Sequence, residues 1–230
     1  MTGQGSDAAS DVAAGGTSLE LADWRRRTSA LYAEVRERAA SDPRAAWERW
    51  RAVREAMYRE HPQSPVPVAA RATFRARHWP YDPTLRFGVD VEVEVEGPSD
   101  STGADSTGGA PILPMSSGRA LDFARIGQVT VPLPAGPRTL GLFWMAGYAG
   151  GLFLPFRDAT NGRETYGAGR YLLDSAKGAD LGGDPGTGRL VLDFNFAFQP
   201  SCAFDPRWAC PLAPPENRLD LPIEAGERLR

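Results

Sequence analysis

The first pattern along the chain is a helical spacing of apolar residues. Between residues 18 and 40, Trp24, Leu31 and Val35 fall on one face of a helix, with arginine and glutamate around the rest. Ser18 is a suitable N-cap for this helix. Residues 1–17 are small and mostly polar, so they are expected to form a disordered leader.

A second helix is predicted directly after the first. Asp42 followed by Pro43 is a typical helix start, with an N-cap residue and a proline at the first helical position. An apolar stripe then runs to about Tyr58 and comprises Ala46, Trp50, Val53 and Met57. Because prolines at 61–65 end the pattern, residues 18–60 are predicted to form a helical hairpin that packs on the rest of the protein.

Beyond Val68 the apolar spacing changes from helical to alternating. At 87–95, mostly valines alternate with mostly acidic residues, which predicts a strand with one buried and one solvent-facing side. Residues 98–109 contain almost no apolar side chains and are expected to form a flexible loop. Further strands are predicted at 120–126, 128–133, 139–145, 151–156, 165–172 and 190–198, with turns at 134–137, 161–162 and 182–186.

Many short strands at this spacing favour an antiparallel β barrel or sandwich. The expected fold class is therefore mainly β with N-terminal α, a β domain at 66–230 preceded by the helical hairpin. Its last part, 198–230, is rich in proline and is predicted to be irregular. The sequence lacks a strand–helix alternation and a phosphate-cradling glycine motif, which argues against a parallel nucleotide-binding fold.

The net charge and the hydropathy of the chain limit which partners and which cellular compartment are expected. The 26 basic and 29 acidic residues give a net charge of −3, which argues against nucleic acid as a partner held by bulk electrostatics. The sequence contains no apolar run of membrane-spanning length and no secretory signal pattern at its start. A cytoplasmic protein without a membrane partner is therefore expected, and no particular cofactor or oligomeric state is indicated.

The chain has two cysteines and two histidines. Cys202 and Cys210 are eight positions apart in a proline-rich stretch, and in a reducing compartment free thiols are favoured over a disulfide. Together with His61 and His78 they offer four zinc ligands, but the usual close pairing of ligands is missing. No metal site is therefore expected.

Two segments concentrate residue types that carry chemistry. In the first, Arg157, Tyr166 and Arg170 surround the turn at 161–162, and glycines at alternate positions of the predicted strand allow close approach of a ligand or another backbone. In the second, Asp193 and Asn195 share one face of a strand whose other face is aromatic. Polar residues at such positions indicate either a solvent-exposed face or a buried network in which every polar group is hydrogen-bonded. In such a network, Arg157 or Arg170 is the expected charge partner.

These segments resemble a family of prokaryotic proteins of unknown function, domain of unknown function 1684. The resemblance covers roughly the last third of the chain and rests on the following residues: Arg157-Asp158-x-Thr160-x-Gly162-x-x-Thr165-Tyr166-Gly167-x-Gly169-Arg170-Tyr171-Leu172; Leu192-Asp193-Phe194-Asn195; Pro200-x-Cys202-Ala203; Cys210-Pro211; Pro214-Pro215-Glu216-Asn217-Arg218-Leu219; and Ala225-Gly226-Glu227. The second helix and 61–65 show weaker similarity. The resemblance implies which segments form a signature region and implies no substrate.

The first functional hypothesis is a β domain that binds a small molecule with an anionic group. The residues expected to contact the ligand are Arg157, Tyr166, Arg170, Asn195 and Asn217, with the tail closing over them. The site is predicted where the strands at 165–172 and 190–198 meet the proline-rich tail.

Two alternatives use the same residues differently. An enzyme would use Asp193 or Glu216 as general acid or base, with Tyr166 in support, or Cys202 as a nucleophile if a base or positive charge activates it. A structural or interaction module would use the signature residues only to lock the fold, and replacement of Arg170 would then unfold the protein.

Overall fold

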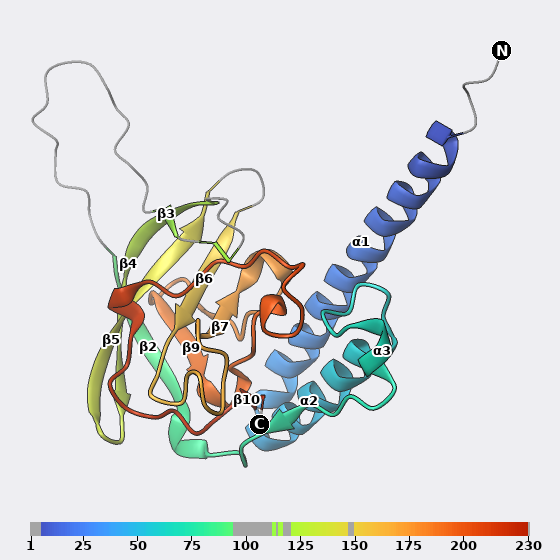
Figure 1. Cartoon of the computed structure of the whole chain (residues 1–230). Helices are drawn as coiled ribbons and strands as arrows, with labels where there is room; N and C mark the ends of the chain where they lie inside the picture. Colours follow the sequence, from blue (N-terminus) through green and yellow to red (C-terminus); the bar gives the residue numbers. More distant parts are fainter. Residues whose placement is uncertain (1–5, 94–111, 114, 117–120, 147–149, 230) are drawn as a thin grey trace, which may run out of the picture.

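The computed structural model describes residues 6–93, 112–113, 115–116, 121–146 and 150–229, with side chains from residue 17 on. The loop predicted at 98–109 and the end of the strand predicted at 87–95 lie outside these residues. The described part contains a helical hairpin, a curled antiparallel sheet and a small two-stranded ladder (Figure 1).

Two antiparallel helices, α1 (Ser6–Ala39) and α2 (Pro43–Glu60), form the hairpin. The predicted start of α2 is confirmed, because the Asp42 side chain accepts a hydrogen bond from the Ala45 amide at 2.9 Å. The start predicted at Ser18 is wrong, since α1 already begins at Ser6 and includes much of the expected disordered leader. Residues 6–17 contain four alanines, and alanine has the highest helix propensity of all residues. An apolar stripe alone does not reveal this preference.

The hairpin packs on the β domain through its tryptophans. Trp50 is fully buried and its ring lies 5.2 Å from that of Phe196, while Trp47 Nε1 donates to the Asn195 carbonyl at 2.9 Å. Figure 1 shows both helices lying along one side of the sheet, with the N-terminal part of α1 extending away from it.

The large sheet curls into a half-barrel, so the predicted mainly β fold is confirmed (Figure 1). Its strand order is β7-β6-β5-β4-β2-β9-β8, with β3 paired to β4, and every pairing is antiparallel. The strands are β2 (Arg86–Val93), β3 (Ile112–Leu113), β4 (Leu121–Leu133), β5 (Gly136–Met145), β6 (Gly151–Phe156), β7 (Arg170–Asp174), β8 (Gly183–Asp184) and β9 (Arg189–Asp193). One apolar cluster joins the helices to the sheet, and a second fills the β domain.

The strands predicted at 120–126 and 128–133 are a single strand, β4, with a bulge before Gly127. A Cβ at Gly127 would lie 2.3 Å from the Glu92 carbonyl oxygen, so only glycine allows β2 to approach there. The sequence pattern predicts a break between two strands at this glycine. In the structure the glycine marks a close contact between β4 and β2.

Two predicted strands are shorter than expected. The segment predicted as a strand at 165–172 is a turn until β7 begins at Arg170, because Thr165 is hydrogen-bonded back to Thr160 and Gly169 adopts a φ of 107°. The strand predicted at 190–198 ends at Asp193, whose carboxylate accepts from the Asn195 amide and starts the short helix η3 (Phe194–Phe196). The aromatic residues of this segment therefore do not share one strand face.

A short ladder between β1 (Arg77–His78) and β10 (Glu227–Arg228) ties the end of the chain to the segment after the hairpin. Before it come a loop and the short helix α3 (Val68–Arg71). Arg71 fixes this loop, because its guanidinium donates to the carbonyls of His61, Pro62, Ser64 and Val66 at 3.0–3.3 Å. The remaining short helices are η1 (Pro83–Leu85), η2 (Ser175–Lys177), η4 (Ser201–Ala203) and η5 (Pro215–Asn217).

Candidate functional site

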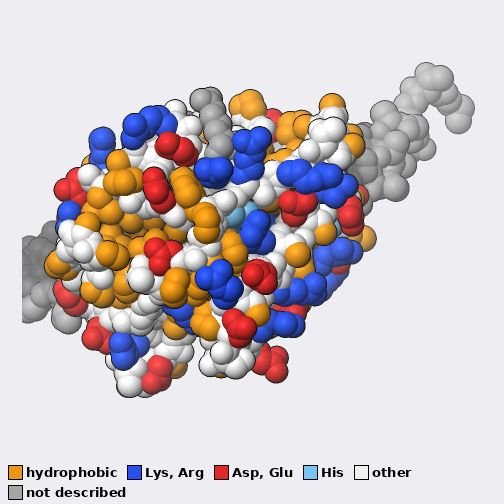
Figure 2. All heavy atoms as spheres, turned by 90° about the horizontal axis from the view of Figure 1, so that it is seen from below, with side chains coloured by type: hydrophobic (Ala, Val, Ile, Leu, Met, Phe, Trp, Pro, Cys, Tyr) orange, Lys and Arg blue, Asp and Glu red, His pale blue; other side chains and the backbone are white. Residues whose placement is uncertain are grey.

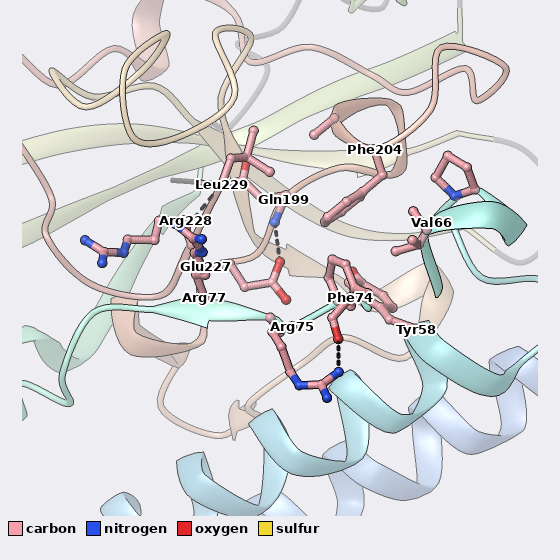
Figure 3. A pocket seen from close by; sticks show the side chains of 14 residues that line it. Tyr58, Val66, Phe74, Arg75, Arg77, Gln199, Phe204, Glu227, Arg228 and Leu229 are labelled. Atoms are coloured by element: carbon pink, nitrogen blue, oxygen red, sulfur yellow. Dashed lines mark hydrogen bonds between the residues drawn. The ribbon is translucent and has the colours of Figure 1, made fainter. Parts of the chain in front are cut away.

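A cavity of about 340 Å³ lies between α2, the loop around α3 and the β1–β10 ladder (Figure 3). Its apolar wall is aromatic, since the rings of Tyr58, Phe74 and Phe204 lie 5.3–5.9 Å from one another. Val66 and Leu229 complete this wall. The wall comes from three distant parts of the chain, and it fits the apolar body of a small molecule.

The polar side of the cavity contains a buried ion pair. Glu227 is 3% exposed, and its carboxylate accepts from Arg54 Nε at 2.5 Å and from the Gln199 amide at 2.8 Å. Burial alone would lower the pKa of Arg54, but the charge of Glu227 raises it above its usual range. Glu227 and Arg54 therefore neutralise each other and leave the charge of the cavity to its other residues.

The cavity is also lined by arginines whose charge is not neutralised by the described residues. Arg77 and Arg228 stand directly opposite each other in the β1–β10 ladder. Neither forms an ion pair within the described chain, and Arg228 Nε is buried without a hydrogen-bond partner there. Arg75 donates to the Phe74 carbonyl, and in Figure 3 its guanidinium points away from the aromatic wall. Like charges directly across a ladder destabilise it, so this edge favours an anion.

The surface at this end of the molecule has two halves. Figure 2 views it from below and shows lysine and arginine side chains concentrated over its centre and the side of the helices. Apolar side chains gather over the side of the sheet. The cavity itself is lined by Arg75, Arg77 and Arg228 and by one acidic residue, Glu227, although the whole chain carries a net charge of −3.

Arg170, predicted as a ligand residue, is fully buried in the described structure. Its guanidinium donates to Asp158 Oδ2 at 2.6 Å, to the Ile223 carbonyl at 2.8 Å and to the Ala225 carbonyl at 2.5 Å. Burial lowers the pKa of Arg170, while Asp158 opposes this shift. The geometry is that of a clamp between β7 and the C-terminal tail.

Asn195 and Asp193 hold the segment before β2. The Asn195 amide donates to the Asp82 carbonyl at 2.7 Å and accepts from the Asp82 amide at 2.8 Å. Asp193 forms an ion pair with Arg86 at 3.1 Å. Burial raises the pKa of Asp193, and hydrogen bonds from Asn195 and Arg86 oppose the shift. Neither residue lines the cavity at β1–β10.

Asn217 and Arg157 connect the tail to the half-barrel. The buried Asn217 amide accepts from the Gly141 amide at 2.7 Å and donates to the carbonyls of Gly141 and Pro155 at 2.9 and 2.7 Å. Arg157 is half-buried and donates to the Ala168 carbonyl at 3.3 Å. Glu216 is on the surface, paired with Arg125 at 3.0 Å. Among the described residues, Arg170, Asn195 and Asn217 share no hydrogen-bond partner.

Tyr166 and Cys202, both candidate catalytic residues, lie close together. Burial, followed by a hydrogen bond with Cys202, raises the pKa of Tyr166 to about 12. Both cysteines are buried free thiols. The described residues contain no group of three or more His, Cys, Asp or Glu side chains arranged to hold a metal.

The sequence did not single out Arg77 or Arg228 as site residues. The only signal for this edge was Glu227, which lies in the family resemblance. Two-residue strands leave no periodic pattern, and about 150 positions of sequence separate β1 from β10.

Comparison with known proteins identifies the family. A family model described as "Protein of unknown function (DUF1684)" matches residues 76–228, so the chain belongs to this family. A solution structure of an uncharacterised protein from Haloarcula marismortui is similar, with 28% sequence identity and a TM-score of 0.56, over 84% of this chain and 97% of that one. No curated protein matches. Within the described chain, no helix is both long and apolar enough to cross a membrane.

Proposed function

We propose that this protein binds a small molecule with an apolar body and an anionic group in the cavity at the β1–β10 ladder. The single observation that supports this is the facing pair Arg77 and Arg228, unneutralised beside an aromatic wall. The anion would lie at these arginines, and the apolar body would lie against Tyr58, Phe74 and Phe204. Arg157 and Arg170, expected earlier to bind the anion, are replaced in this role.

The proposal is tested with two probes of equal length, octanoate and octan-1-ol, by isothermal titration calorimetry. Octanoate is expected to bind about tenfold or more tightly than the alcohol, because only it pairs with the guanidinium groups. Arg77→Gln is expected to weaken octanoate and leave octan-1-ol unchanged. Ala70→Phe, which fills the cavity from α3, is expected to weaken both.

Equal affinity for the two probes would refute recognition of an anion and leave an apolar cavity. Heat signals that are unchanged by Ala70→Phe would place the binding elsewhere on the protein.

We also propose a cytoplasmic location.

A further inference from the structure

The fold brings the two cysteines of the chain together. The Cys202 amide donates to Cys210 Sγ at 3.3 Å. Cys202 is held in η4, and Cys210 is held by two hydrogen bonds to Ser116, one from its amide to Ser116 Oγ and one to its carbonyl from the Ser116 amide, both 3.0 Å. The positions of both thiols are thus fixed by the backbone on each side of them.

The surroundings of Cys202 favour its thiolate. Hydrogen bonds from the Cys210 thiol and from the Tyr166 hydroxyl outweigh burial and lower the pKa of Cys202 to about 6. The pKa of Cys210 is raised, because its proton is held by the sulfur of Cys202. The arrangement therefore favours a thiolate at Cys202 and a protonated thiol at Cys210.

The pair lies close to the surface although both side chains are at most 8% exposed. The residues between them, 203–209, are all half-buried or exposed. Ala203 and Phe204 of the same loop also line the cavity at β1–β10.

From this arrangement we propose that Cys202 and Cys210 are a hydroperoxide-responsive thiol pair that forms a reversible intramolecular disulfide. The Cys202 thiolate attacks one peroxide oxygen and the O–O bond breaks; the second oxygen leaves and is protonated to water or an alcohol, and Cys202 becomes a sulfenic acid. The Cys210 thiol then attacks the Cys202 sulfur, the S–O bond breaks, and the hydroxide leaves as water with the Cys210 proton. The peroxide takes up the two electrons that the two thiols lose.

This proposal does not rest on the proposed function, because neither cysteine lines the cavity. The two fail separately, since octanoate binding is measured on the reduced protein and the thiol chemistry needs no ligand.

The experiment treats the full-length reduced protein with hydrogen peroxide and records its intact mass without reductant. The wild type is expected to lose the mass of two hydrogen atoms as a monomer and to regain it with dithiothreitol. With dimedone present, Cys210→Ser is expected to gain an adduct on Cys202, and Cys202→Ser is expected to gain none. Serine is nearly isosteric, and circular dichroism verifies that each variant is folded.

A second measurement does not depend on variants. The rate of alkylation of the folded wild type by iodoacetamide is expected to rise with a midpoint near pH 6, well below that of an ordinary thiol. The proposal is overturned if peroxide leaves the folded wild type unchanged while the urea-unfolded protein forms the disulfide, or if the product is an intermolecular dimer. A dimedone adduct on Cys210 in place of Cys202 would overturn the assigned roles.

Discussion

The buried arginine of β7 and the two arginines of the β1–β10 ladder use the same side chain in opposite ways. Arg170 is surrounded by one carboxylate and three backbone carbonyls, and it has no exposed surface. Arg77 and Arg228 face each other and have no carboxylate partner among the described residues. Both regions belong to the family region of the chain.

This difference teaches where a charge is available to a ligand. Arg170 lies in a segment that carries the family resemblance, and for this reason the sequence suggested it as a ligand residue. In the structure its guanidinium donates to groups of the protein itself. Arg77, in a two-residue strand, forms no ion pair with the described residues, and Arg228 lies opposite it. The two kinds of arginine are expected to differ in how much they contribute to the free energy of unfolding, and the largest effect is expected at Arg170.

Replacement of Arg170 by alanine is expected to cost about 3–5 kcal/mol of the free energy of unfolding, because Asp158 is left as an unpaired buried charge. Urea unfolding followed by circular dichroism measures this loss. The matched control is Arg138→Ala, whose ion pair with Asp220 is on the surface, so its loss is expected to change the free energy of unfolding very little. Equal effects of the two changes would contradict the clamp assigned to Arg170.

Asn217→Ala is expected to cost about 2–3 kcal/mol, since it leaves the Gly141 amide and two carbonyls buried without partners. Its control is Gln128→Ala, an amide that hydrogen-bonds only other side chains and is expected to cost about 0.5 kcal/mol. If Asn217→Ala keeps full stability, the amide does not bridge β5 and the end of β6.

The sequence predicted those elements whose signal is local. The α2 cap and β6 were found because a cap or an apolar run lies within a few residues. The strand predicted at 165–172 is too long, because a hydrogen-bond network from Asp158 to Thr165 holds the start of that segment in a turn. An alternating apolar pattern gives no sign of such a network. The bulge at Gly127 depends on a contact with β2, which no local pattern contains.

For the candidate site, the sequence predicted an arginine-lined anion site but selected the arginines of the signature segment. Arg170 and Arg77 differ in what the fold places around them, and much of this comes from distant residues, such as Ile223 for Arg170 and Arg228 for Arg77. Tyr166 and Cys202 were each named as candidates from the sequence, but their proximity was not predicted.

The next largest effect concerns pH. His78 lies edge-on to the rings of Trp47 and Trp50, and neither ring nitrogen has a hydrogen-bond partner in the described chain. Burial, then the charges of Arg51 and Arg54, lower its pKa to about 4, although Glu227 opposes them.

Below pH 6.5, His78 therefore becomes protonated in the unfolded chain, whereas it stays neutral in the folded protein until the pH reaches about 4. Stability falls as pH decreases from 6.5 to about 4, by on the order of 2 kcal/mol. In His78→Phe this part of the slope is expected to disappear, and urea midpoints at several pH values measure it. Carboxylates that titrate in the same window are present in both proteins and cancel in the difference. An unchanged slope would mean that His78 accepts its proton in the folded state.

The smallest expected effect completes the contrast with Arg170. Arg77→Gln is expected to leave the free energy of unfolding unchanged or to raise it by about 0.5 kcal/mol at low salt, because it removes repulsion between like charges across the ladder. Added sodium chloride is expected to raise the stability of the wild type more than that of the variant, since salt screens the same repulsion. A loss of more than about 1 kcal/mol would show that Arg77 is engaged by the protein itself, and the edge would then resemble the clamp at Arg170. An unchanged stability together with weaker octanoate binding would separate the two uses of arginine in one protein.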